Sequence, residues 1–230
     1  MSRLSRFTFA VLVVAAGTLA GAIARADEGE FPIKADDGTT IANHRIPAEL
    51  ESAIEKLPDV VVAANPKGKV TLYEFYDLNC PYCRKASADI DELVRANRQL
   101  RLVLVPFAVL GIPSILAARV EYAVARLATP QKFYEFHRLV YAGRGVVDDR
   151  RAFEAAQKIG LDMAKVRAIA NEDSFAKVMT AHVRLGDALG IQATPGLVIK
   201  GVVIVGYPGK ATLTKVIASA QRCGAVVCAN

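Results

Sequence analysis

The sequence has few of the side chains from which most protein metal sites are built. Its 230 residues include four cysteines, three histidines and three methionines. The histidines His44, His137 and His182 lie far apart, and no second pair with CxxC or HxxxH spacing accompanies the single CxxC pair. A zinc site made from two such pairs is therefore not expected, and the sequence predicts no metal and no cofactor.

Long apolar runs and clusters of one charge are also missing from most of the chain. Beyond the first 26 residues, no stretch of about 18 residues is apolar and free of charge, so no membrane-spanning helix is expected there. The formal net charge is +6, from 29 basic and 23 acidic residues. No basic cluster is interleaved with aromatic residues, so we expect no binding to nucleic acid.

The first 26 residues have the pattern of a secretory signal. Arg3 and Arg6 precede an apolar run, and Ala24-Arg25-Ala26 places small residues at a cleavage site, which predicts removal after Ala26. An uncleaved membrane anchor is the alternative, but the run is short and interrupted by glycine. Residues 27–230 would form a mature chain of 204 residues with charge +3, because residues 1–26 carry three arginines and no acid. Four cysteines in an exported protein fit a compartment where disulfides persist.

Residues 70–85, VTLYEFYDLNCPYCRK, carry the strongest indication of chemistry. A β-rich run ends in Cys80-Pro81-Tyr82-Cys83 and passes into a helical pattern. A sulfur at the first turn of a helix is stabilised as a thiolate by the exposed N–H groups and the helix dipole. Pro81 fits the first helical turn, and Tyr82 is the variable residue between the cysteines. The pattern favours a redox pair, with half of a metal site or two inert buried cysteines as alternatives.

Glu74 is unusual within the strand that leads to this motif. The strand, residues 70–76, has large apolar side chains on both sides, as expected for a central strand covered on both faces. A carboxyl group there would be partly desolvated, so its pKa would rise and it could hold a proton near neutral pH. The alternative is an edge glutamate that faces water.

The remaining periodicity predicts one α/β unit with a helical insertion. Residues 27–59 form a polar leader with a short helix at 47–57, and residues 60–222 form the main domain. Within it we expect a helix at 80–98, a parallel strand at 100–105, an insertion of helices at about 111–190, a hairpin after residue 196 and a last helix at 210–222. Thr194-Pro195, which introduces the hairpin, is a candidate cis peptide; a trans proline at the start of an edge strand is the alternative. The leader helix either packs on the domain or forms an oligomer contact.

This combination resembles the thioredoxin superfamily and, within it, the DsbA-like periplasmic thiol:disulfide oxidoreductases. The resemblance rests on YEFYDLNCPYCRK, on the helical insertion and on ATPGLVI at 193–199. It implies a thioredoxin-like fold, in which a central mixed β-sheet is flanked by helices. It also implies Cys80 as nucleophile, Cys83 as resolving thiol and Glu74 as the buried acid that relays the proton of Cys83. Thr194 would bind substrate backbone, beside cis-Pro195.

The resemblance further implies an enzyme in the periplasm that exchanges disulfides with unfolded or misoxidised exported proteins and is reset by a membrane redox partner. Tyr82 and Thr194 depart from the histidine and valine of strongly oxidising members, and look more like disulfide isomerases and reductases such as DsbG and the suppressor-of-copper-sensitivity proteins. We therefore expect a less depressed Cys80 pKa and a less oxidising potential than in the histidine enzymes. A copper(I)-binding chaperone that uses the same two sulfurs is a further alternative.

Two more cysteines, Cys223 and Cys228, lie in a C-terminal tail of residues 223–230. We expect them to form a structural disulfide. The alternatives are a second redox pair that exchanges electrons with Cys80 and Cys83, free thiols, or disulfides between molecules.

Overall fold

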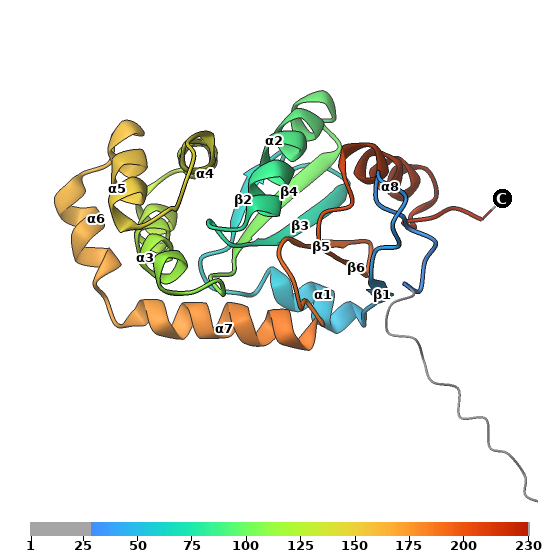
Figure 1. Cartoon of the computed structure of the whole chain (residues 1–230), viewed down its shortest axis with the longest axis horizontal. Helices are drawn as coiled ribbons and strands as arrows, with labels where there is room; N and C mark the ends of the chain where they lie inside the picture. Colours follow the sequence, from blue (N-terminus) through green and yellow to red (C-terminus); the bar gives the residue numbers. More distant parts are fainter. Residues whose placement is uncertain (1–28, 230) are drawn as a thin grey trace, which may run out of the picture.

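A computed structural model of the protein describes residues 29–229 (Figure 1). Its centre is a mixed sheet with the strand order β1-β6-β5-β3-β4-β2. The strands are β1 (Asn43–Arg45), β2 (Val61–Ala64), β3 (Val70–Tyr76), β4 (Leu100–Pro106), β5 (Gly196–Ile199) and β6 (Val202–Val205). Only β3 and β4 pair in parallel, through the crossover helix α2 (Pro81–Ala96), as the sequence predicts.

Strand β3 is central because both of its faces are buried. Leu72 and Tyr76 belong to the core under α2 and α8 (Lys210–Cys223), whereas Tyr73 and Phe75 belong to the core on the opposite face. That second core is covered by α1 (Ala48–Ile54) and α7 (Ser174–Ala188), which run along the lower side of the sheet in Figure 1. Helices therefore flank both faces, which confirms the thioredoxin-like architecture.

The insertion between β4 and β5 consists of five helices. They are α3 (Ile112–Leu127), α4 (Pro130–Ala142), α5 (Asp149–Lys158), α6 (Met163–Ala170) and α7. Asp162 caps α6, accepting hydrogen bonds from the N–H groups of Ala164 and Lys165 at 2.9 and 3.3 Å. Helices α3 to α6 form a unit beside the sheet, and α7 returns the chain beneath it (Figure 1).

The leader takes more part in the sheet than its sequence indicates. Strand β1 pairs antiparallel with β6, and β2 pairs antiparallel with β4, so the leader and its junction provide both edges of the sheet. The sequence analysis predicted neither strand. Helix α1 is also shorter than the predicted 47–57. The predicted signal, residues 1–26, lies outside the described residues. Within 29–229, no helix has the length and apolar character needed to cross a bilayer.

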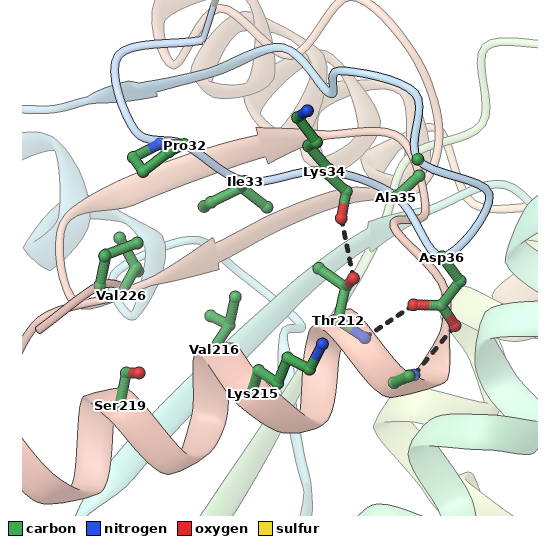
Figure 2. Close-up of a pocket in the computed structure, with 13 residues that line it drawn as sticks. Pro32, Ile33, Lys34, Ala35, Asp36, Thr212, Lys215, Val216, Ser219 and Val226 are labelled. Atoms are coloured by element: carbon green, nitrogen blue, oxygen red, sulfur yellow. Dashed lines mark hydrogen bonds between the residues drawn. The ribbon is translucent and has the colours of Figure 1, made fainter.

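The leader also docks on α8 (Figure 2). Asp36 accepts hydrogen bonds from the N–H groups of Ala211 and Thr212 at 3.0 and 2.7 Å, and the Thr212 hydroxyl donates to the carbonyl of Lys34 at 2.8 Å. A cavity of about 530 Å³ lies between these segments and Val226 of the tail. Asp36 thus satisfies the helix N-terminus that would otherwise face this cavity.

Candidate active site

Cys80 and Cys83 lie at the N-terminus of α2, and both are free thiols. Cys80 is the N-cap residue, and its Sγ accepts a hydrogen bond from the Cys83 N–H at 3.4 Å. The Cys83 thiol also donates a hydrogen bond to this sulfur, and that bond is the largest cause of the lowered Cys80 pKa. Together with a hydrogen bond from the Thr194 side chain, this contact lowers the pKa of Cys80 to about 6 although burial opposes the shift. Cys80 can therefore be a thiolate at neutral pH.

Cys83 has the opposite character. It is fully buried, whereas Cys80 keeps 4% of its surface exposed. Burial raises the pKa of Cys83, and the hydrogen bond to Cys80 and the nearby Glu74 carboxyl raise it further. One sulfur is consequently a thiolate near the surface, and the other is a protonated thiol behind it.

The hairpin loop completes the surroundings of Cys80. The Thr194–Pro195 peptide bond is cis, as predicted, and precedes β5 directly. The Cys80 thiol lies 3.1 Å from the Thr194 carbonyl oxygen and can donate to it. Two segments more than a hundred residues apart thus meet at one sulfur.

Glu74 lies inside the sheet and not at its edge. Its register partners are Leu104 on β4 and Leu197 on β5, and its side chain has no exposed surface. Neither carboxyl oxygen has a hydrogen-bond partner. Burial, with the negative charge of Cys80, raises the pKa of Glu74 to about 8. The water-facing alternative is therefore wrong, and Glu74 holds a proton at neutral pH.

The sequence analysis did not identify the two polar residues that precede Cys80. The Asp77 carboxylate accepts hydrogen bonds from the N–H groups of Val109 and Leu110, at 2.8 and 2.9 Å, and from the Ser114 hydroxyl at 2.7 Å. Asn79 donates to the Val147 carbonyl at 2.9 Å and accepts from its N–H at 2.8 Å. These residues fix two loops of the insertion beside the cysteine motif, and their place next to CxxC was the only indication in the sequence.

Exposed apolar side chains collect on these same segments. In residues 29–229, eight large apolar residues are exposed. Seven of them lie on the cysteine motif, on the two loops that Asp77 and Asn79 hold, or on the first turns of α3. We call this set the apolar rim: Tyr82, Val109, Leu110, Ile112, Ile115, Leu116 and Val146. The eighth is Val227 in the tail. Contiguous exposed apolar surface is typical of a site that binds another molecule.

A second buried carboxyl group lies in the insertion. Glu121 on α3 accepts a hydrogen bond from the Tyr76 hydroxyl at 2.7 Å, and burial raises its pKa to about 8. The Tyr76 ring packs edge-on against His137 of α4, with centroids 4.6 Å apart. The only indication of the Glu121–Tyr76 hydrogen bond in the sequence was a glutamate at one of the apolar positions of α3.

Cys223 and Cys228 are joined by a disulfide at the end of α8. They form a pair separate from Cys80 and Cys83. Within residues 29–229, no group of three or more histidine, cysteine or acidic side chains is arranged to hold a metal ion.

Comparisons with known proteins agree with this geometry. A family model described as Thioredoxin matches residues 57–219. A thioredoxin-like oxidoreductase from Silicibacter pomeroyi is 28% identical, with a TM-score of 0.66 over 73% of this chain and 95% of that one. No curated protein sequence matches significantly.

Two further solved structures share the fold at lower identity. The thiol-disulfide exchange protein alpha-DsbA2 from Wolbachia pipientis is 22% identical, with a TM-score of 0.63 over 74% of this chain and 95% of that one. The catalytic domain of Proteus mirabilis ScsC is 21% identical, with a TM-score of 0.65 over 76% and 95%.

Proposed function

This chain belongs to the thioredoxin family, and on that premise we propose that it is a thiol:disulfide oxidoreductase that exchanges disulfides with exported proteins through Cys80 and Cys83. The observation that carries the proposal is the unequal state of the two sulfurs. Cys80 has a pKa of about 6 at the N-terminus of α2, while Cys83 is buried and protonated. A low-pKa thiolate is both an effective nucleophile and a good leaving group in disulfide exchange.

The exchange proceeds in two steps. In the oxidised enzyme, a substrate thiolate attacks the Cys80 sulfur; the Cys80–Cys83 bond breaks and a mixed disulfide forms. A second substrate thiolate then attacks the substrate sulfur of the mixed disulfide. The substrate leaves with its own disulfide, and both enzyme cysteines are reduced by a total of two electrons.

Glu74 serves the buried sulfur. When Cys83 is released as a thiolate it is strongly basic, and neutral Glu74 can give it a proton. In the reverse direction, the Glu74 carboxylate takes the proton from Cys83 before that sulfur attacks. A carboxyl group with a pKa of about 8 suits both directions near neutral pH.

The substrates that fit this site are unfolded or misoxidised protein chains. The apolar rim offers contacts to apolar segments of many sequences, and Thr194 offers main-chain hydrogen bonding beside the sulfur. The pattern of residues 1–26 supports export to the periplasm with cleavage after Ala26. Repeated oxidation there requires an oxidant for the reduced cysteines, and the proposed oxidant is a membrane redox partner. Double replacement of Leu110 and Ile112 by serine should slow exchange with a protein substrate while exchange with dithiothreitol is kept.

The direction of exchange depends on the reduction potential. Tyr82 cannot supply the positive charge that a histidine at its position would lend to the thiolate. This favours a less oxidising enzyme, which would act as an isomerase or reductase of the kind represented by DsbG and ScsC. Copper(I) binding by the same two sulfurs is the competing function, and a copper(I) affinity measured beside the reduction potential separates the two.

The deciding experiment compares Cys80→Ser and Cys83→Ser with the unmodified protein on reduced and on scrambled ribonuclease. Cys80→Ser should abolish exchange, and Cys83→Ser should accumulate mixed disulfides, because the resolving thiol is missing. Faster recovery of activity from scrambled than from reduced ribonuclease would assign the isomerase direction. Full activity of Cys80→Ser would refute the proposal.

A further inference from the structure

The buried polar atoms that lack hydrogen-bond partners gather in one place. In residues 29–229, every such side-chain atom lies on β3, α2 or α4. The atoms are Oε1 and Oε2 of Glu74, Oδ1 of Asp91, the hydroxyl of Tyr134, Nδ1 of His137 and Nε of Arg138. A buried polar group without a partner costs about 1–3 kcal/mol, so such groups are rarely kept together without a reason. We call these five residues the polar seam.

The outer end of the seam opens into a cleft between α2 and α4. The cleft has a volume of about 200 Å³, and both Asp91 and Arg138 line it, with Ser87, Ala88 and Tyr141. The side chain of Asp91 is 17% exposed and that of Arg138 is 39% exposed. Solvent therefore reaches one end of the seam, whereas Glu74 at the other end has no exposed surface.

The inner part of the seam consists of two aromatic residues of α4, Tyr134 and His137. The His137 ring packs on Tyr76, which lies two residues after Glu74 on the same side of β3, and it stacks on Tyr134 with centroids 6.3 Å apart. Burial raises the pKa of Tyr134 most, followed by the charge of Asp91, a weak side-chain hydrogen bond to Asp91, and the charge of Glu74. Tyr134 is thus within electrostatic reach of the carboxyl groups at both ends. Burial and Arg138 lower the pKa of His137 to about 3, so its ring is neutral.

Water can supply the hydrogen-bond partners that these atoms lack. A water molecule occupies about 30 Å³ in the liquid and needs two to four polar partners, so the cleft can hold several. The unpartnered atoms of the seam supply both donors and acceptors for such water. A water path from the cleft toward Glu74 is the arrangement that would give these atoms hydrogen-bond partners.

We propose that the polar seam is the route by which Glu74 exchanges its proton with solvent, with Tyr134 and Asp91 as positioning residues for the water along it. The inference rests on the proposed function. When the disulfide opens, Cys83 takes one proton from Glu74, and the Glu74 carboxylate takes one proton from the seam. When the disulfide closes, one proton travels outward. No electrons pass through the seam, so it sets a rate and leaves the equilibrium of exchange unchanged.

The test fills the seam and removes its inner hydroxyl. Ala88→Leu places an apolar side chain over the cleft from an exposed position of α2, and Tyr134→Phe removes the hydroxyl but keeps the ring. Matched controls are Ala96→Leu, at an exposed position of the same helix, and Tyr122→Phe, elsewhere in the insertion. An indicator dye in stopped flow follows the protons in solution while oxidised protein is reduced by dithiothreitol at pH 7. Oxidation of dithiothreitol releases two protons and Cys83 takes up one, so the proton uptake of the protein is resolved as a separate phase against the release from the reductant.

The double variant Ala88→Leu/Tyr134→Phe should take up its proton about tenfold or more slowly, since a positioned proton transfer contributes about 10²-fold or more. Its equilibrium constant with dithiothreitol should equal that of the unmodified protein, and both controls should behave normally. An unchanged rate overturns the proposal, as does a change in the equilibrium constant that accompanies the slower rate. Tyr134→Phe alone, slowed by a smaller factor, serves if the double variant does not fold.

The variant Glu74→Gln separates two outcomes: the seam is not the proton route, or Glu74 is not the proton relay of the proposed function. If Glu74→Gln is slow while the seam variants are normal, Glu74 acts as proposed but receives its proton by another path. If Glu74→Gln is itself as fast as the unmodified protein, the proton-relay part of the proposed function is wrong, and the seam is wrong with it.

Discussion

Asn79, the residue before the nucleophilic cysteine, exchanges two hydrogen bonds with the backbone of Val147, 68 residues further along the chain. Arg84, the residue after Cys83, donates to the carbonyl oxygens of Tyr141 and Gly145 at 3.3 and 3.1 Å. The cysteine motif therefore holds the loop between α4 and α5 from both sides. That loop carries Val146, one of the most exposed members of the apolar rim.

Replacement of Asn79 by alanine should destabilise the protein and loosen this loop. The change removes the hydrogen bonds of the side chain to Val147 and to Ser114, each worth about 1 kcal/mol net, so we expect a loss of about 2–3 kcal/mol. Urea unfolding at pH 7 measures the loss, and amide exchange at Val147 reports the loop. Asn171→Ala, at an exposed position, is the control. Unchanged protection of Val147 would contradict the assignment.

Glu74→Gln should stabilise the reduced protein, increasingly so as the pH rises. The Glu74 pKa is about 8 in the folded protein and about 4.5 when unfolded. Between these values the unfolded chain loses the proton first, so the free energy of unfolding falls with rising pH. The glutamine variant escapes this loss and should gain up to about 3 kcal/mol at pH 7, but nothing below about pH 4.5. Urea unfolding of the variant and the unmodified protein is compared at pH 7 and below about pH 4.5, with exposed Glu135→Gln as control. If the variant gained the same stability at the two pH values, the raised pKa of Glu74 would not be the cause.

Alkylation of Cys80 by iodoacetamide should follow a pH midpoint near 6. Because the hydrogen bond from the Cys83 side chain is the largest cause of the low pKa, Cys83→Ala should raise the midpoint. Cys83→Ser keeps a donor and should raise it less. Equal midpoints for these two variants would mean that the helix terminus alone stabilises the thiolate.

Loss of the tail disulfide should affect stability and leave exchange intact. Cys223 and Cys228 close a loop of only six residues, for which the chain-entropy relation gives about 2 kcal/mol. The double serine variant should therefore unfold at lower urea concentration and exchange disulfides at the normal rate. Thiol counting on the reduced-site protein should give two reactive thiols under denaturing conditions. Four thiols after turnover would instead favour a second redox pair.

The sequence predicts the secondary structure correctly where a periodic pattern and the local motif agree. Strand β3, helix α2 and the helical insertion lie close to their predicted ranges, because each has a long regular pattern with caps or turns at its ends. Strands β1 and β2 were missed since they have three and four residues, too few for alternation to be recognised. What makes them strands is pairing with β6 and β4.

The polar part of the site was predicted less completely. Glu74 could be identified because a carboxylate interrupts an apolar strand. The roles of Asp77 and Asn79 depend on loops 30 to 70 residues away, and the seam depends on how α2 faces α4. Such contacts have no local signature, because any polar residue on a helix or in a turn is ordinarily expected to face water.

The position of β1 also constrains the order of folding during synthesis. Asn43 pairs with Ile204, so one border of the sheet joins segments about 160 residues apart. Strand β1 can pair with β6 only after nearly the whole polypeptide has been synthesised. Pairing at this edge of the sheet is therefore late, and it is slow because closing so long a loop costs entropy.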